Sequence, residues 1–313
     1  MTIRRDESTR TVRAPAKLNI YLEVLGRRAD GFHELETLIV PVRLWDSLTL
    51  AATPPSSAGQ PGPIVLSVRS CLPARASPRS QDLPPTGDNN LVVRALKLLR
   101  DRSDCAAGAR VELVKRIPMA AGLGGGSSDA AMALRLANRA WRLGWTHDRL
   151  LELAAEVGSD VPFFLFGGAA VCRGRGERVE PLSGIARLHF VIVKPPLDLS
   201  TADVYRAHDA LGGQAEQRKG GQLDGLVLAL RRGRYSKLGH FMMNRLEAAA
   251  ATLSPWIKRV RPVFEQLGCL GHQLSGSGSS YFGVCRHAQQ ARRLVAVLRA
   301  RQLGLVCATC SCQ

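Results

Sequence analysis

Apolar and polar residues alternate near the start of the chain, as the two faces of a half-buried strand require. Leu18, Ile20, Leu22 and Val24 take every second position, which predicts a strand-rich segment over residues 11–24. Alternation and short apolar runs predict further strands at residues 47–51, 64–68, 109–115, 161–166, 169–172, 188–193, 271–274 and 281–285. Strands are therefore expected along most of the chain.

Apolar residues that recur every three or four positions mark the predicted helices. Leu91, Ala95 and Leu98 share one face of a helix that Asp88 or Asn89 would cap. Further helices are predicted at residues 130–141, 147–157 and 203–210, the second of them ended by Gly158. This mixture of helices and strands, without an internal repeat, predicts an α+β fold.

Turn-forming residues divide the chain into parts. Residues 52–88 are rich in proline, serine and glycine and are predicted to be largely a surface loop insertion around one short strand. Residues 212–221 form a second polar, glycine-rich loop. A length of 313 residues allows two domains of ordinary size. A boundary near residues 181–184 would separate a domain over 1–180 from one over 181–313.

The charge of the chain narrows the classes of partner. Its formal net charge is +17, which attracts polyanions. An enzyme that acts on nucleotides or diphosphates fits this charge, and so does an RNA-binding protein, although only 5% of the residues are aromatic. The charge alone does not separate the two classes.

Two segments indicate where in the cell the protein is expected: Met1 to Glu7, and Val161 to Cys172. The first is charged and lacks the apolar stretch of a secretory signal, and the second is too short to span a bilayer. The eight scattered cysteines are typical of reduced thiols, and Cys307, Cys310 and Cys312 lack a nearby fourth ligand for zinc. We therefore expect a cytoplasmic protein with no membrane partner and no protein-bound metal site.

The run from Pro118 to Asp129 carries the strongest chemical signal. It contains three consecutive glycines, Gly124 to Gly126, between a predicted strand and a predicted helix. Such a turn presents free backbone N–H groups and the positive end of a helix dipole to a phosphate. Ser127 and Ser128 add hydroxyls that can cap the helix or reach a phosphate or its magnesium ion. A flexible linker is the alternative, but linkers are uncommon between a strand and a long helix.

Three known phosphate-binding plans do not match this run. No Gly-Lys-Ser/Thr follows, as a Walker A motif requires, and Ser127 stands where the dinucleotide fingerprint needs its last glycine. The chain also lacks the His-Arg-Asp and Asp-Phe-Gly motifs of protein kinases.

The run instead resembles the second motif of the GHMP kinases, a family that includes galactokinase, homoserine kinase, mevalonate kinase and phosphomevalonate kinase. The resemblance implies a two-domain α+β fold, with an N-terminal domain related to a ribosomal protein domain, a ferredoxin-like C-terminal domain and the active site in the cleft between them. It implies ATP with Mg²⁺ as the cofactor. The ATP-binding residues that it implies are Pro118, Met119, Ala120, Ala121, Gly122, Leu123, Gly124, Gly125, Gly126, Ser127, Ser128, Asn90, Leu91 and Lys115.

Asp160 and Lys17 are the candidate catalytic residues. Asp160 lies at a predicted helix-to-strand corner beside apolar residues, where a carboxylate can serve as a general base or simply cap a turn. Lys17 interrupts an apolar stretch and needs a partner if it is buried, whereas at a strand end it could lie on the surface. The resemblance implies that Asp160 faces the hydroxyl that accepts the phosphoryl group and that Lys17 is its partner.

Phe32 and His33 follow an Asp-Gly turn, which could be an ordinary hairpin. The chain is most similar to the GHMP kinases that phosphorylate the 2-hydroxyl of a cytidine diphosphate ester of methylerythritol, a precursor of isoprenoids. In those enzymes an aromatic residue stacks on cytosine and the histidine bonds to its edge, and Tyr205 would be the second aromatic residue. The other substrate-binding residues that the resemblance implies are Asn19, Thr201, Gly276 and Gly278.

Two alternatives stay open at this stage. A different GHMP kinase would act on homoserine, a mevalonate-type acceptor or a sugar, because the phosphate loop alone does not separate acceptors. An RNA-binding protein of related fold would use the basic charge and would bind RNA with a steep dependence on salt. The primary expectation is a small-molecule substrate and no nucleic acid, and the sequence is silent on oligomeric state.

Overall fold

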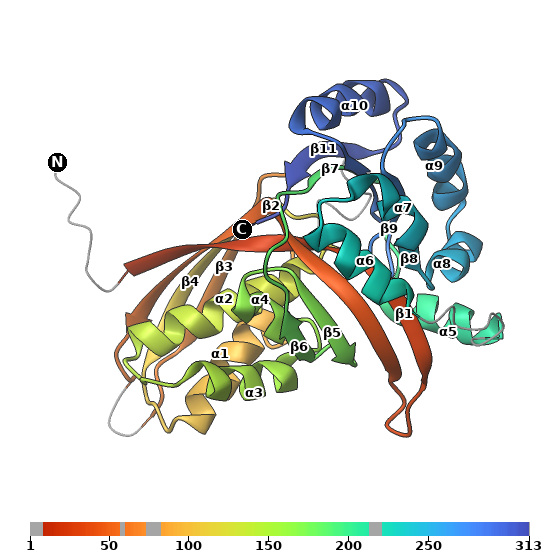
Figure 1. The fold of residues 1–313 in the computed structure, drawn as a ribbon. Helices are drawn as coiled ribbons and strands as arrows, with labels where there is room; N and C mark the ends of the chain where they lie inside the picture. The colour runs from red at the N-terminus through yellow and green to blue at the C-terminus, as the bar shows by residue number, and fades with distance from the viewer. Residues whose placement is uncertain (1–8, 57–59, 73–82, 213–220, 313) are drawn as a thin grey trace.

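The computed structural model describes residues 9–56, 60–72, 83–212 and 221–312 and builds them into two β-sheets with helices on their faces (Figure 1). The strands of the first sheet are β1 (Thr9–Arg27), β2 (His33–Thr53), β3 (Ile64–Ser70), β4 (Gly108–Lys115), β5 (Ala170–Gly174), β6 (Arg178–Pro181) and β8 (Met243–Asn244). Their order is β3-β4-β2-β1-β8, and β5 joins β2 to β6. The long β2 pairs with β5 along its first part and with β4 along its last part. The predicted α+β fold is confirmed.

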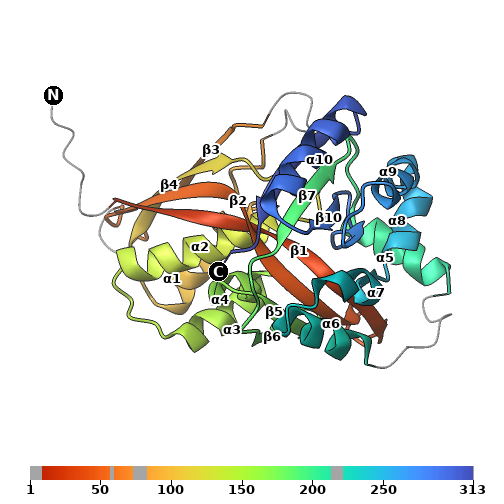
Figure 2. The same ribbon diagram turned by 45° about the horizontal axis from the view of Figure 1, so that its top comes forward.

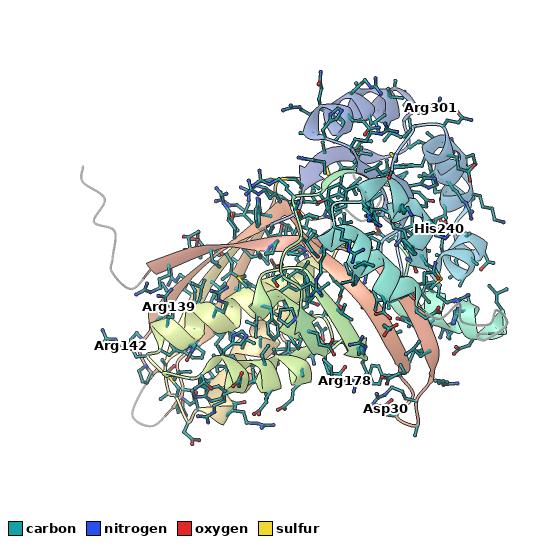
Figure 3. The ribbon with its side chains drawn as sticks, viewed as in Figure 1. Asp30, Arg139, Arg142, Arg178, His240 and Arg301 are labelled. Atoms are coloured by element: carbon teal, nitrogen blue, oxygen red, sulfur yellow. The ribbon has the colours of Figure 1, made fainter. Side chains whose placement is uncertain are left out.

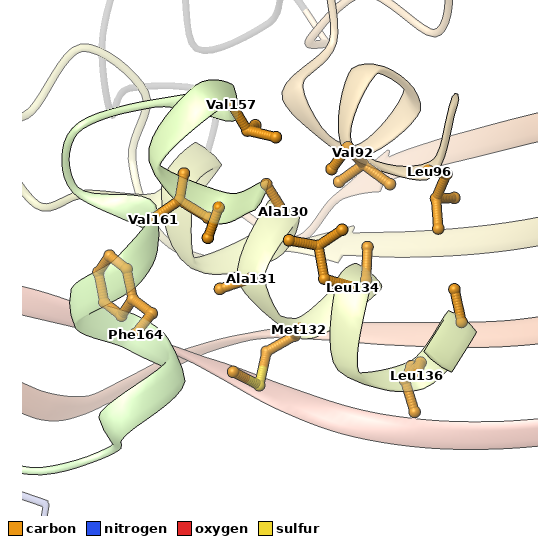
Figure 4. Close-up of a cluster of buried hydrophobic side chains, with 14 of the residues drawn as sticks. Val92, Leu96, Ala130, Ala131, Met132, Leu134, Leu136, Val157, Val161 and Phe164 are labelled. Atoms are coloured by element: carbon orange, nitrogen blue, oxygen red, sulfur yellow. The ribbon is translucent and has the colours of Figure 1, made fainter. Parts of the chain in front are cut away.

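Four helices cover one face of the first sheet (Figure 1). They are α1 (Leu91–Arg102), α2 (Gly125–Ala140), α3 (His147–Val157) and α4 (Val161–Phe166). Figure 4 shows where they meet: Leu96 of α1, Leu134 of α2 and Val161 of α4 belong to one cluster of buried side chains. The apolar face that the 3.6-residue period places on α1 and α2 is thus the face that packs on the sheet.

The second sheet contains β7 (His189–Lys194), β9 (Gly271–Leu274), β10 (Tyr281–Cys285) and β11 (Leu305–Cys310). Its order is β11-β7-β10-β9, with antiparallel pairs throughout. The other helices are α5 (Thr201–Ala210), α6 (Gln222–Arg231), the 3₁₀ helix Tyr235–Lys237, α7 (Leu238–Phe241), α8 (Glu247–Leu253), α9 (Pro255–Glu265) and α10 (Ala288–Ala300). Figure 2 shows α10 lying over this sheet. Phe190 packs in the apolar cluster with α6, and Val191, the next residue of β7, packs in the cluster with α8 to α10.

Main-chain pairing and an ion pair join the two halves of the chain. β8 pairs in parallel with β1, and Ser311 forms a bridge to Val42 of β2. Arg245, just after β8, donates to both carboxylate oxygens of Glu23 in β1, at 2.7 and 2.9 Å. A site that uses both halves can therefore be held rigidly. The division into residues 1–180 and 181–313 stays a prediction.

Three local predictions differ from the structure. The strand predicted at residues 161–166 is wrong, because this apolar run is helix α4, with Pro162 in its first turn, where a missing N–H costs no hydrogen bond. Asn90, and not Asp88 or Asn89, caps α1 by accepting a hydrogen bond from the Val92 N–H at 2.8 Å. The helix after the glycine run begins at Gly125, earlier than predicted.

The two predicted loops are described only in part. Within residues 52–88, β2 continues to Thr53 and β3 extends over Ile64–Ser70, while residues 57–59 and 73–82 lie outside the described residues. Of the predicted loop at 212–221, residues 213–220 lie outside them as well.

The basic charge is not confined to one end of the molecule. Arg139 lies in the last turn of α2 and Arg142 just after that helix, and Arg301 lies on the opposite side of the view, after α10 (Figure 3). Among the helices of the described segments, none has the length and apolar character that crossing a membrane needs.

Candidate active site

A cavity of about 930 Å³ receives residues from both halves of the chain. Its walls come from β1, the β1–β2 turn, the glycine run, the start of α4, the β5–β6 turn, α5 and the loop between β9 and β10. The cavity therefore unites segments that are far apart in the sequence, and most of them were predicted separately from the sequence.

Nearly all of the predicted site residues lie along this cavity. Those that line it are Lys17, Asn19, Phe32, His33, Asn90, Leu91, Lys115, Pro118, Met119, Ala120, Ala121, Gly122, Leu123, Gly124, Gly125, Gly126, Ser127, Asp160, Thr201, Tyr205 and Gly276. Ser128 and Gly278 are not among the lining residues: Ser128 is fully buried in α2, and a side chain at Gly278 would point at Leu274 and Leu199. The roles of all these residues stay predictions.

The glycine run forms a turn that opens directly into α2. Gly124 has a φ of 69°, which favours glycine, and helix α2 begins at the next residue. No side chain caps this helix end, so Ser127 and Ser128 are not caps but members of its first turn. The first-turn N–H groups have no partner within the helix and point out of its positive end. This geometry suits the phosphate cradle that the sequence predicts.

Main-chain contacts hold the glycine run in place. The Lys17 N–H donates to the Leu123 carbonyl at 2.9 Å, and the Ser275 hydroxyl donates to the Gly122 carbonyl at 3.0 Å. Gly122 has a φ of 71°, and a Cβ atom there would lie 2.0 Å from the Ser275 carbonyl oxygen. The loop between β9 and β10 therefore packs against the glycine run without room for a side chain.

Replacing Gly122 with Ala is expected to lower kcat/KM for ATP about tenfold or more, because left-handed backbone costs about 1–2 kcal/mol and the new Cβ displaces the facing loop. Steady-state kinetics with varied ATP measures this loss. Gly144→Ala is the matched control, since Gly144 has a similar φ of 66° but no atom within 4 Å of the new Cβ. Equal activity losses in the two variants would contradict the packing argument.

Lys17 and Asp160 meet in the cavity wall. Their Nζ and Oδ2 atoms lie 3.4 Å apart, and the Lys17 side chain is only 7% exposed while that of Asp160 is 35% exposed. Lys17 also donates to the Asn19 Oδ1 atom at 2.6 Å, and the Asn19 amide donates to the Thr37 hydroxyl at 2.9 Å. The lysine is therefore held by a hydrogen-bonded chain, while the carboxylate keeps an accessible side toward the cavity.

The Lys115 ammonium lies in a buried ionic cluster at the cavity wall. Its ammonium donates to Asp46 and, at 2.7 Å, to Asp129, and all three side chains are buried. Burial alone lowers the pKa of Lys115, but the two carboxylates raise it above the ordinary value. The Lys115 ammonium is thus committed to this cluster beneath the first turn of α2.

The other end of the cavity holds the predicted base pocket. The His33 ring stacks on Tyr205 with a centroid distance of 4.7 Å, and the guanidinium of Arg175 lies 4.8 Å from the centre of the Phe32 ring. Phe32 is 49% exposed, so its ring is accessible to a ligand. Burial, together with the charge of Asp160, raises the pKa of the Tyr205 hydroxyl above its ordinary value, which keeps this ring neutral.

Several residues that line the cavity, or that contact its lining side chains, were not predicted from the sequence. Asp46 and Asp129 anchor Lys115, and Asp209 accepts a hydrogen bond from His33 at 2.7 Å. Asp46 gave no local signal, because its partners are far away in the chain. Arg175 and Asp209 did leave one: Arg175 stands between two glycines in a turn, and Asp209 follows Tyr205 by one helical turn.

A bound magnesium ion would depend mainly on ATP for its ligands. Among the described residues, no group of three or more His, Cys, Asp or Glu side chains could hold a metal ion. Mg²⁺ often keeps several waters and binds through one or two protein oxygens together with substrate phosphates. Ser127, which lines the cavity in the first turn of α2, offers such an oxygen. The donor set therefore fits a nucleotide-bound ion.

Comparisons with known proteins agree with this geometry. Residues 90–168 match the model of the GHMP kinases N terminal domain, and residues 226–302 match that of the GHMP kinases C terminal. The chain is 40% identical, over 92% of its length and 93% of the relative's, to the 4-diphosphocytidyl-2-C-methyl-D-erythritol kinase of Pelotomaculum thermopropionicum.

Solved structures place the chain in the same family. A crystal structure of 4-(cytidine 5'-diphospho)-2C-methyl-D-erythritol kinase superposes with a TM-score of 0.74 at 34% identity, covering 97% of this chain and all of that one. The mevalonate kinase of L. major has a TM-score of 0.74 at 17% identity, with 97% of each chain covered, and shows that the fold is shared more widely. This chain belongs to the GHMP kinase family.

Proposed function

We propose that this GHMP kinase transfers the γ-phosphoryl group of ATP to the 2-hydroxyl of 4-diphosphocytidyl-2-C-methyl-D-erythritol, giving the 2-phosphate and ADP in isoprenoid precursor biosynthesis. One observation carries the proposal: the glycine run, the Lys17–Asp160 pair and the Phe32–His33–Tyr205 pocket line one cavity. The names and sequence identities of the relatives support the choice of acceptor.

The proposed transfer uses each part of the cavity in turn. The N–H groups at the start of α2 bind the terminal phosphates of ATP. The hydroxyl oxygen of the acceptor bonds to the γ-phosphorus, and Asp160 takes the proton of that hydroxyl. The bond from the γ-phosphorus to the oxygen that bridges it to the β-phosphate breaks, and ADP is released. Lys17 stabilises the negative charge on the attacking oxygen, and Asn19 holds Lys17 in place.

Mg²⁺ belongs to this proposal as the partner of ATP. When bound, it neutralises charge on the transferring phosphates. Ser127 is the residue that we propose as its protein ligand. Ser128, which is fully buried, we leave out of that role.

The acceptor assignment rests on the base pocket. Aromatic rings on two sides of a cavity stack well on a flat base, and such stacking contributes about 1–3 kcal/mol per base. Phe32 and Tyr205 would provide the rings, with the Arg175 guanidinium close to the Phe32 ring. Residues 1–180 as the ATP-binding domain, the cytoplasmic location and the absence of a nucleic-acid partner stay predictions.

A panel of acceptors tests the function. We expect ADP release with 4-diphosphocytidyl-2-C-methyl-D-erythritol and at least about 100-fold lower kcat/KM with homoserine, mevalonate or galactose, because these lack the group that fills the base pocket. A coupled ADP assay measures each rate. Turnover of one of these other acceptors at the higher rate would assign the chain to a different GHMP activity.

A further inference from the structure

One face of α5 is turned toward the base pocket at three positions. Thr201, Tyr205 and Asp209 are spaced by four residues, so they follow one another along the same side of the helix, and all three line the cavity. Thr201 bonds to the Ser277 hydroxyl at 2.9 Å, and Tyr205 stacks on His33. The face therefore connects the loop after β9 to the turn between β1 and β2.

Asp209 makes the contact that fixes the His33 ring. Its Oδ1 atom lies 2.7 Å from the His33 Nε2 atom, and the His33 side chain is only 10% exposed. The rings of His33 and Tyr205 are nearly parallel, with an angle of 25° between them. The stack and the hydrogen bond together leave the imidazole little freedom to rotate.

This contact also determines where a neutral imidazole carries its proton. An ionised carboxylate can only accept a hydrogen bond, so the Nε2 atom that faces Asp209 must be the donor. The Nδ1 atom is then an acceptor with a free lone pair. Within the described residues, the Nδ1 atom has no hydrogen-bond partner. A ligand in the pocket thus meets an acceptor on this ring.

A hydrogen-bond acceptor at this position distinguishes cytosine from uracil. Cytosine carries an amino group, a donor, at the position where uracil carries a carbonyl oxygen, an acceptor. A buried site built to accept a hydrogen bond rejects a ligand that presents a second acceptor, because both groups then lose a partner.

We propose that Asp209 is the positioning residue for base selection: it holds the Nε2 proton of His33, so that Nδ1 accepts a hydrogen bond from the cytosine amino group and rejects uracil. This inference rests on the proposed function, because it takes a cytidine diphosphate ester as the substrate. Asp209 itself contacts His33 and not the reacting atoms, so it acts through the ring that it orients.

The variant Asp209→Asn tests the proposal. An Asn side chain can donate to Nε2 through its NH₂ group or accept from it through its carbonyl oxygen, so it no longer restricts the ring proton to Nε2, and Nδ1 is free to become a donor. We expect the ratio of CDP to UDP affinity, measured by calorimetry at pH 8, to fall about tenfold or more, with weaker CDP binding and UDP binding retained or improved. With the cytidylyl substrate, KM should rise about tenfold while kcat stays within about twofold.

Two controls separate a positioning role from a structural one. Asp209→Glu keeps the carboxylate and should keep the preference for CDP, and Asp224→Asn makes the same chemical change on an exposed part of α6. Equal losses of CDP and UDP affinity in Asp209→Asn would indicate a structural effect and would overturn the proposal. In the wild-type enzyme, ¹⁵N chemical shifts of the His33 ring that place the proton on Nδ1 would overturn it without any variant at residue 209.

The outcomes also distinguish this inference from the function on which it rests. A wild-type enzyme that binds CDP and UDP equally would remove the cytidine assignment and the inference together. A wild-type enzyme that prefers CDP, with the same preference in Asp209→Asn, would leave the assigned function intact and reject the role of Asp209 alone.

Discussion

Replacement of Asp160 with Asn is expected to lower kcat by about 10²- to 10⁴-fold, the usual contribution of a positioned general base. The amide keeps the shape of the carboxylate but cannot take the proton of the acceptor hydroxyl. Binding of a non-hydrolysable ATP analogue, measured by calorimetry, should change by no more than about threefold. The reason is that Asp160 lies beside Lys17 and not in the first turn of α2, where the phosphates are expected to bind.

The matched control for this variant is Asp101→Asn. Asp101 is an exposed aspartate in the last turn of α1 and is not part of the cavity wall, so its replacement should leave kcat unchanged. Undiminished turnover in Asp160→Asn would remove the general base from the mechanism. A simultaneous loss of turnover and of ATP binding would instead indicate that the Lys17–Asp160 pair supports the nucleotide site.

The sequence predicted those features of the fold that depend on local patterns. Alternation of apolar residues suits β4, and short apolar runs suit β7 and β10, because the neighbours of each strand bury one or both of its faces. These patterns failed at Val161–Phe166, where six apolar or aromatic residues in a row suit a buried strand as well as a buried helix. Pro162 is the second residue of that run, and proline is common in the first turn of a helix. This was a local signal for a helix, and the alternation rule does not take it into account.

The candidate site was predictable where a single segment contains all the groups that one binding function needs. The glycine run provides the turn, the close approach and the helix start within a few residues, so its sequence alone indicated a phosphate cradle. Lys17 and Asp160 are different, because 143 positions separate them and only the family resemblance paired them before the structure placed them 3.4 Å apart. The hydrogen-bonded chain from Lys17 through Asn19 to Thr37 depends on pairing between β1 and β2, which no local pattern specifies.

Buried charges were the hardest features to predict. Asp46 is fully buried in β2 between Trp45 and Ser47, although an aspartate is ordinarily exposed. Its partners are the Lys115 ammonium and the backbone N–H groups of Arg116 and Ile117. It accepts hydrogen bonds from these two N–H groups at 2.5 and 2.9 Å. Only the packing of β2 against β4 brings these groups together, so the cluster follows from tertiary structure and not from the local sequence.

That cluster gives the largest expected effect on stability. Lys115→Met is expected to lower the free energy of unfolding by about 3–5 kcal/mol, because it leaves the carboxylates of Asp46 and Asp129 buried without a cation. Lys97→Met is the matched control, since the Lys97–Asp88 pair is exposed and such pairs contribute about 0–1 kcal/mol. Urea unfolding followed by circular dichroism measures both changes, and similar small losses in the two variants would contradict the argument.

The pH dependence of the same experiment tests the cause. Burial and the neighbouring Asp46 raise the pKa of Asp129 to about 7, although Lys115 opposes the shift. A carboxyl group whose pKa is raised by folding binds its proton more tightly in the native state, so its contribution to stability grows as the pH falls from about 7 toward about 4. Without Lys115 the buried Asp129 carboxyl group gains more by protonation, and the loss in Lys115→Met should be smaller at pH 5 than at pH 8. An equal loss at both pH values would assign the effect to packing around the lysine stem instead of to unpaired charge.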